Sequence, residues 1–224
     1  MTLLNRLAIH RAGGRSVVIS PRRPFPAERP VGLVIGGGDD IGPVVEAGAL
    51  EPALRIDRAR DRLERRLLDD LAGPGFPILG ICRGAQMLNL HRGGTLHADI
   101  YAAYAGARRL RTVLPRKRVA IRPGTRLAGI IGRERVRVNA LHHQSVDRLG
   151  RGLAVAAIDE AGIVQAVEDA AARFVIGVQW HPEMLVTRRR QQRLFDRLVE
   201  AAPREPRTRD GRAVAQLDPT LAGL

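Results

Sequence analysis

Residues 76–91 read Phe-Pro-Ile-Leu-Gly-Ile-Cys-Arg-Gly-Ala-Gln-Met-Leu-Asn-Leu-His, and this stretch decides the fold. The apolar run at 76–81 is typical of a buried strand, and residues 83–91, followed by two glycines, are typical of a short helix. Apolar runs at 16–20 and 31–35 predict two earlier buried strands, and a leucine stripe predicts a helix at 55–71. This alternation predicts an α/β fold with a mostly parallel central sheet flanked by helices.

The rest of the chain extends this fold. Residues 112–121, 135–139, 153–158, 162–167 and 174–179 have strand-like patterns and predict an added β-rich segment. A last amphipathic helix is expected at 187–201. We therefore expect residues 1–202 to form a single domain, and the polar, proline-containing residues 203–224 to be a disordered tail.

Composition excludes several classes of protein. The 224 residues are 45% hydrophobic, which suits one domain, and no apolar run reaches the length of a membrane span, so we expect a cytoplasmic protein. The single cysteine excludes an internal disulfide framework. The net charge of +14 could attract nucleic acid, but the arginines at 55–66 alternate with acids as on a solvated helix face, and 3% aromatic content leaves few base-stacking platforms. We therefore expect neither a nucleic acid nor a membrane as partner.

The cysteine stands between the strand and the helix, in Gly80-Ile81-Cys82-Arg83-Gly84. Glycines two residues before and after it suit the tight strand-to-helix turn of a nucleophile elbow, where a Cβ atom would not fit. A helix that begins here directs unpaired N–H groups at the sulfur and favours the thiolate. A buried cysteine that acts as a small apolar residue is the alternative, but this pattern favours a nucleophile.

Two partners for the cysteine follow the apolar residues 174–178, in Gln179-Trp180-His181-Pro182-Glu183. In extended backbone, His181 and Glu183 lie on the same side, so the carboxylate can orient the imidazole. The carboxyl ends of parallel strands share one edge, so we expect this pair near the cysteine. The alternative is a capping histidine and a surface glutamate before the last helix.

Donors for an oxyanion are also at hand. Residues 36–38 are three glycines after a predicted strand, and bare backbone N–H groups there can approach a ligand. The amide of Arg83 can contribute from the helix start. A flexible loop or a phosphate cradle is the alternative, although neither G-x-G-x-x-G nor a Walker sequence is present.

Five stretches together, at 33–39, 77–89, 93–97, 138–145 and 177–183, resemble one known group of proteins. The chain is similar to the class I glutamine amidotransferase-like superfamily and, within it, to the γ-glutamyl-γ-aminobutyrate hydrolase family. Cys-Arg-Gly at 82–84 and Asn-Ala-Leu-His-His-Gln at 139–144 are more specific to that family than the cysteine and His-Pro-Glu motifs alone.

The resemblance implies a flavodoxin-like parallel-sheet fold, no metal or organic cofactor, and hydrolysis of γ-glutamyl amides, such as γ-glutamyl-GABA, through a γ-glutamyl thioester. It implies that Cys82 is the nucleophile, His181 the base and acid, and Glu183 the orienting carboxylate. The Gly37 and Arg83 amides would form the oxyanion hole. Gln86 would help to seat the γ-glutamyl group, and His142, His143 and Gln144 would line the pocket.

The adjacent histidines allow other interpretations. A metal site is disfavoured because neighbours on a strand point to opposite sides and no helical His pair accompanies them. A structural role for one of the two histidines competes evenly with a role in substrate binding.

The chain also departs from the family. Relatives begin with an extra strand, whereas this chain begins inside the following helix, at residues 3–14. Either the true start lies upstream or the sheet is completed differently, for example by a partner subunit. A homodimer is left open. Gln165 stands where relatives tend to have Glu, which puts a substrate contact there in doubt.

Three functions therefore compete. A stand-alone γ-glutamyl hydrolase leads, because the triad and the His-His-Gln segment are complete. The glutaminase component of an amidotransferase shares the triad, and a non-catalytic binding protein on the same fold would keep the fold without thiol reactivity.

Overall fold

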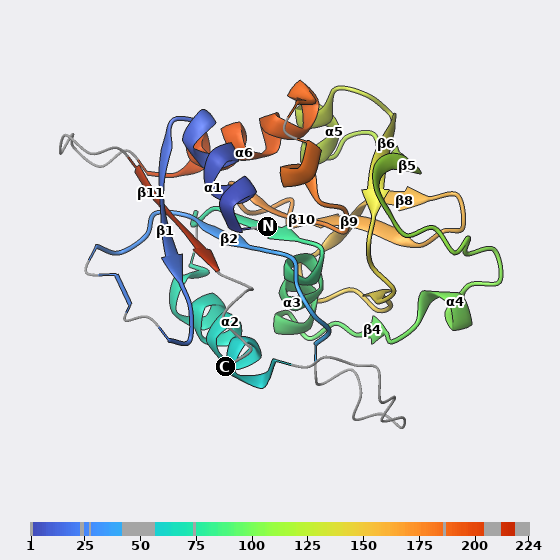
Figure 1. Ribbon diagram of the computed structural model, residues 1–224, viewed down its shortest axis with the longest axis horizontal. Coiled ribbons are helices and arrows are strands. Elements are labelled where there is room, and N and C mark those ends of the chain that lie inside the picture. Colours follow the sequence, from blue (N-terminus) through green and yellow to red (C-terminus); the bar gives the residue numbers. More distant parts are fainter. Residues whose placement is uncertain are drawn as a thin grey trace.

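The computed structural model describes residues 2–22, 25–26, 28–41, 57–73, 75–185, 187–203 and the backbone of 212–217 (Figure 1). The helices are α1 Thr2–Arg11, α2 Arg58–Leu71, α3 Arg83–His91, α4 Ile100–Ala103, α5 Arg126–Ile131 and α6 Arg189–Ala201, with a 3-10 turn η2 at Pro182–Leu185. The strands are β1 Gly14–Ile19, β2 Leu33–Ile35, β3 Ile78–Ile81, β4 Leu96–His97, β5 Thr112–Ile121, β6 Arg135–Ala140, β7 Ser145–Val146, β8 Ala154–Asp159, β9 Val164–Glu168, β10 Val175–Val178 and β11 Arg212–Leu217.

The central sheet has nine strands among the described residues, in the order β1-β11-β2-β3-β10-β9-β8-β5-β6. The strands β1, β11, β2, β3 and β10 are parallel to one another, whereas each later pair, from β10–β9 to β5–β6, is antiparallel. The expected α/β fold with a mostly parallel sheet and an added β-rich segment is confirmed. Because β2, β3 and β10 are adjacent and parallel, their carboxyl ends meet at one edge.

Helices cover both faces of the parallel half, with α1 and α6 on one face and α2 and α3 on the other (Figure 1). The period-two alternation of a strand produces this division, since successive side chains point to opposite faces. Val34 therefore packs in the core with α1 and α6, whereas Leu33 and Ile35 pack in the core with α2 and α3. Both faces of these strands are buried, which explains their continuous apolar sequences.

The expectation of a disordered tail at 203–224 is wrong for residues 212–217. These residues form β11, which lies parallel between β1 and β2 and pairs with both. The short apolar run Ala-Val-Ala-Gln-Leu at 213–217 is surrounded by charged and proline residues, so its sequence alone does not indicate a strand. In the structure, β1 and β2 on either side provide hydrogen-bond partners for its backbone. The chain's own carboxyl-terminal segment thus occupies the sheet position that we left to an upstream segment or a partner. Residues 204–211 and 218–224 lie outside the described residues.

The solvated face predicted for the helix at 55–71 is also wrong in part. Arg60, Asp61 and Glu64 are only 3%, 6% and 0% exposed, although Arg62 and Arg66 are exposed as expected. The helix begins at Arg58, and the Asp57 side chain caps it by accepting a hydrogen bond from the Arg60 amide at 3.0 Å. The sequence does not indicate this buried polar stripe, because oppositely charged residues at i,i+4 spacing occur on both exposed and buried helix faces.

No helix in the described part of the chain is long and apolar enough to cross a membrane.

Candidate active site

Cys82 lies at a sharp turn between β3 and α3. Its backbone has φ +52° and ψ −106°, and it is the single non-glycine residue with positive φ among the described residues. A Cβ atom on Gly84 would overlap the Ile35 carbonyl, and one on Gly80 would lie 2.7 Å from the Gly84 carbonyl oxygen. The glycines are therefore required by close packing, as the nucleophile-elbow interpretation predicted.

His181 and Glu183 follow β10, the strand that pairs with β3. The imidazole Nδ1 and Glu183 Oε1 are 2.8 Å apart, and both side chains are buried. The pair meets through the 3-10 turn η2 rather than along the extended backbone that we expected. Asn139 at the end of β6 fixes the histidine backbone: its Nδ2 donates to the His181 carbonyl at 3.0 Å, and its Oδ1 accepts from the His181 amide at 2.8 Å.

The sulfur and the imidazole are close enough to interact. Burial by itself lowers the pKa of His181, but the charge of Cys82, a side-chain hydrogen bond to it, and Glu183 outweigh burial and raise this pKa to about 10. The imidazolium is thus the favoured form when a thiolate faces it. Because Nδ1 is held by Glu183, Nε2 is the ring nitrogen left for the sulfur.

The glycine loop at 36–38 lies over this imidazole. A Cβ atom on Gly37 would overlap Cε1 of His181, so the loop backbone can lie this close to the imidazole only because residue 37 is glycine. Arg83 begins α3, and the first amides of a helix have no intrahelical acceptor. The structure therefore places the Gly37 backbone against His181 and the Arg83 backbone next to Cys82, while their role as oxyanion donors stays a prediction.

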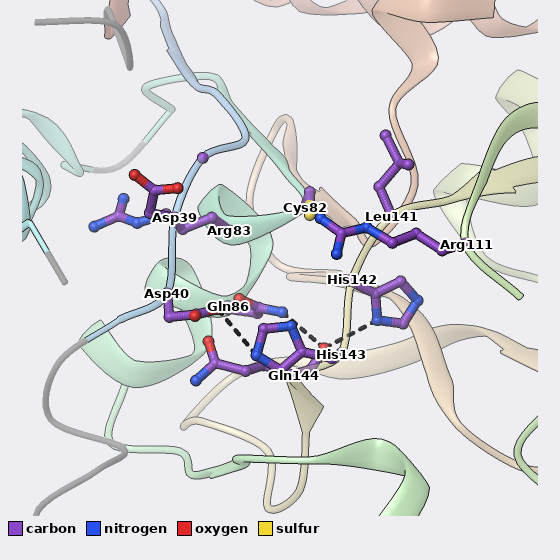
Figure 2. A pocket seen from close by; sticks show the side chains of 11 residues that line it. Asp39, Asp40, Cys82, Arg83, Gln86, Arg111, Leu141, His142, His143 and Gln144 are labelled. Atoms are coloured by element: carbon purple, nitrogen blue, oxygen red, sulfur yellow. Dashed lines mark hydrogen bonds and ion pairs between the residues drawn. The ribbon is translucent and has the colours of Figure 1, made fainter. Parts of the chain in front are cut away.

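A cavity of about 430 Å³ opens beside Cys82 (Figure 2). Its lining comes from the glycine loop, the start of α3, the segment before β5 and the segment between β6 and β7, and comprises Gly38, Asp39, Asp40, Cys82, Arg83, Gln86, Arg111, Leu141, His142, His143 and Gln144. All four residues predicted from the resemblance to contact substrate are thus in the lining. Their contact with a substrate stays a prediction.

A chain of amide side chains connects the sulfur to the far wall of this cavity. Gln179 Nε2 lies 3.5 Å from Cys82 Sγ, and Gln179 Oε1 accepts from Gln86 Nε2 at 3.1 Å. Gln86 Nε2 also donates to the Gln144 carbonyl at 2.9 Å, and His142 Nδ1 is 2.9 Å from the same oxygen. Gln86 is therefore fixed between the thiol and the His142–Gln144 wall.

The two adjacent histidines differ in their surroundings. His142 is 8% exposed, and burial lowers its pKa to about 4, so it is neutral near pH 7. Its Nδ1 donates to the Gln144 carbonyl, and its Nε2 has no hydrogen-bond partner. The more exposed His143 has its Nε2 3.2 Å from Asp40 Oδ1 (Figure 2). Gln144 Nε2 is likewise buried without a hydrogen-bond partner in the structure.

Several residues of the site were missed or left without a role. Asn139 and Gln179 stand inside the motifs that carry the resemblance, and their position next to functional residues was the available signal. The sequence around Asp40 and Arg111 contains no signal that they belong to the site, because both lie outside the motifs, in connecting segments. Partial burial raises the pKa of Asp40, and nearby His143 and Arg111 oppose this shift.

Gln165 does not line the cavity. Its Nε2 is 3.3 Å from Asp159 Oδ2, and its Oε1 has no partner. Among the described residues, no group of three or more His, Cys, Asp or Glu side chains could hold a metal ion.

Comparisons with known proteins identify the family of the chain. The peptidase C26 family matches residues 3–183. A Mycobacterium tuberculosis protein named "Putative glutamine amidotransferase Rv2859c" is 40% identical over 205 residues, which cover 87% of this chain but only 65% of the relative's length. The γ-glutamyl-γ-aminobutyrate hydrolase PuuD of Escherichia coli K12 is 30% identical over 136 residues, covering 57% of this chain and 54% of that protein.

Solved structures support the fold. A glutamine amidotransferase from Thermotoga maritima superposes with a TM-score of 0.51 at 20% identity, covering 79% of each chain. This likeness concerns the fold alone at such low identity. The family match over residues 3–183 shows that the chain belongs to the peptidase C26 family, which is class I glutamine amidotransferase-like.

Proposed function

We propose that this protein hydrolyses γ-glutamyl amides through a thioester on Cys82. One observation carries the proposal: a cysteine in a strained strand-to-helix turn faces a buried histidine that is itself held at 2.8 Å by a buried carboxylate, and an open cavity adjoins the sulfur. A buried structural cysteine needs neither the strain nor the charged partner.

In the first half of the reaction, the Cys82 thiolate attacks the γ-carbonyl carbon and forms a tetrahedral oxyanion that accepts hydrogen bonds from the Gly37 and Arg83 amides. The C–N bond then breaks, and Nε2 of the His181 imidazolium gives its proton to the departing amine. Glu183 keeps the ring in the orientation in which Nε2 faces the sulfur.

In the second half, neutral His181 takes a proton from a water molecule, and the resulting hydroxide attacks the thioester carbon. Collapse of the second tetrahedral oxyanion releases glutamate and returns the Cys82 thiolate and the His181 imidazolium. The cycle thus consumes one amide and one water and needs no added oxidant, reductant or metal.

The cavity lining suits the two charged groups on the α-carbon of a γ-glutamyl substrate. Asp39 and Asp40 offer anionic partners for an α-ammonium, and Arg111 offers a cationic partner for a carboxylate. His142 and Gln144 add neutral polar side chains to the same lining. The name of the PuuD relative makes γ-glutamyl-GABA the first substrate to try.

A panel of γ-glutamyl amides tests this proposal. Purified protein and its Cys82→Ala variant are incubated with γ-glutamyl-GABA, γ-glutamyl-putrescine and glutamine, and free glutamate is measured. We expect glutamate from at least one amide with the native chain and none with the variant. Equal release by both proteins, or no release from any amide, would contradict the proposal.

A second candidate is the glutaminase component of an amidotransferase, which the printed name of the Rv2859c relative favours. In that case glutamine would be the preferred substrate, and a synthase partner would raise its turnover. Higher activity on glutamine in a lysate fraction containing such a synthase, compared with the purified chain, would support this alternative.

A further inference from the structure

A buried ionic cluster lies directly behind the glycine loop. It consists of Arg60, Asp61 and Glu64 on α2 and the side chain of Arg83 on α3, and none of the four is more than 6% exposed. Arg83 binds both Asp61 and Glu64 through its guanidinium. Arg60 Nε binds the other oxygen of Glu64 at 2.7 Å. The charges of the two cations and two anions compensate one another within the protein.

Arg60 also reaches the glycine loop. Its Nη2 donates to the Gly36 carbonyl at 2.8 Å and to the Gly37 carbonyl at 3.2 Å, and its Nη1 is 3.3 Å from the Gly37 carbonyl. A Cβ atom on Gly38 would overlap Nη1, so the guanidinium fills the space that a side chain at 38 would need. The arginine and the loop are fitted to each other.

These contacts fix the direction of the loop amides. A peptide unit is planar and trans, so the carbonyl of Gly36 and the N–H of Gly37 point in opposite directions. Holding the Gly36 carbonyl on the α2 side therefore turns the Gly37 N–H away from α2. Consecutive glycines would otherwise sample many backbone conformations, so the amide direction needs an external constraint.

Stability alone does not explain such a cluster. Buried ion pairs are weak stabilisers, since desolvation offsets their attraction, and apolar side chains of similar size often serve as well. A leucine at position 60 would pack against α3, but it would leave the Gly36 and Gly37 carbonyls without donors.

We propose that Arg60 is a positioning residue that presets the oxyanion hole, and that Glu64 links its two halves. Glu64 holds Arg60, which orients the Gly37 amide, and it also holds the side chain of Arg83, whose own amide is the second donor. This inference rests on the proposed function for its catalytic meaning, whereas the fixing of the loop is independent of any substrate.

The test compares Arg60→Lys and Glu64→Gln with Arg62→Met, a matched control on the exposed face of the same helix. The lysine keeps the positive charge but cannot bind Glu64 and two carbonyls together. We expect kcat for γ-glutamyl amide hydrolysis to fall about 10- to 100-fold in both variants, somewhat less than the loss of a whole oxyanion donor, with little change in KM. The control should match the native chain.

Two further readouts separate positioning from general damage. Alkylation of Cys82 by iodoacetamide involves no oxyanion, so its rate should stay unchanged in both variants. Hydrogen exchange of the peptide covering residues 33–41 should become faster in both variants and not in Arg62→Met. Arg60→Met removes the guanidinium and its charge entirely. If that variant does not fold, Arg60→Lys and Glu64→Gln alone test whether Arg60 positions the loop.

The outcomes are distinct. Parallel loss of hydrolysis and alkylation would make Arg60 a merely structural residue and overturn the inference, as would unchanged exchange at 33–41. If the native chain releases no glutamate, the proposed function fails, and the exchange experiment still decides whether Arg60 fixes the loop.

Discussion

The site contains two buried histidines, His181 beside Cys82 and His142 in the wall of the cavity, and their pKa values are shifted in opposite directions. His181 is 2% exposed and His142 is 8% exposed, so desolvation acts on both. Anionic partners raise the pKa of His181 to about 10, whereas burial and the nearby cations Lys117 and His181 outweigh the Gln144 carbonyl and Asp159 and lower the pKa of His142 to about 4. Burial therefore does not assign a role to a histidine; its partners do.

The difference extends to the neighbouring residues. On the His181 side, backbone and side chain are held by Asn139 and Glu183. On the His142 side, Nε2 of His142 and Nε2 of Gln144 have no partner. We infer that the first side is preorganised for bond breaking and the second for recognition, because the reacting ring is held by several hydrogen bonds, whereas His142, His143 and Gln144 line the cavity that a substrate would fill.

Substituting each histidine in turn should give the largest difference in kinetics between the two sides. His181→Gln should lower kcat by about 10³-fold or more, since it removes the proton donor to the leaving amine. His142→Gln should act mainly on KM, by about tenfold or less, as expected for one hydrogen bond. Steady-state kinetics on one γ-glutamyl amide measures both, and similar kcat values for the two variants would refute the division.

Removal of the Glu183 carboxylate should have the next largest effect on kcat. Glu183→Gln should lower kcat by about 10²- to 10⁴-fold, because the amide can hold the ring in the wrong tautomer. It also removes an anion that raises the pKa of His181, so the alkaline limb of the pH–rate profile should move to lower pH. As a control, Glu168→Gln alters a carboxylate that caps α5 and should leave the profile unchanged.

The pH dependence of stability should separate the two histidines by sign. The pKa of His181 is raised from 6.5 to about 10, so its contribution is complete below about pH 6.5 and is lost as pH rises through about 10. The pKa of His142 is lowered from 6.5 to about 4, so its contribution is present above about pH 6.5 and is lost as pH falls toward about 4.

Thermal unfolding across this pH range measures both contributions. His181→Gln should flatten the alkaline decline of Tm, and His142→Gln should flatten the acidic decline. An unaltered acidic limb in His142→Gln would show that the ring is not held neutral in the folded protein.

The smallest effect should come from the cavity mouth. His143 is half exposed and its ion pair with Asp40 is 3.2 Å long, so the pair is worth about 0–1 kcal/mol. His143→Ala should therefore change KM by less than about fivefold and leave kcat alone. The effect on KM should disappear in an Asp40→Asn background. A large change in kcat would contradict this assignment and show that His143 takes part in bond breaking.

The sequence was sufficient for the elbow and for the His-Pro-Glu segment because both are local. Gly80 and Gly84 report a turn that no other residue fits, and His181 and Glu183 are two residues apart. Their meeting with Cys82 followed from the parallel order of β3 and β10, which the alternation of strands and helices predicts.

The remaining features depend on contacts between segments that carry no local signal. Burial of Arg60 and Glu64 requires α2 to pack behind the glycine loop, and their i,i+4 spacing is equally common on exposed helices. The insertion of β11 depends on an open position in the sheet, which a segment distant in sequence fills. Arg111 reaches the cavity from a loop, where the sequence specifies no direction.

Trapping the acyl-enzyme tests the central claim most directly. The protein is mixed with a reactive γ-glutamyl amide, quenched in acid within the first turnovers, digested and analysed by mass spectrometry. We predict that the peptide containing Cys82 gains the mass of one γ-glutamyl group, that hydroxylamine removes it, and that it is absent from Cys82→Ala. Glutamate release without any acyl group on Cys82, or with the group on another residue, would contradict the account.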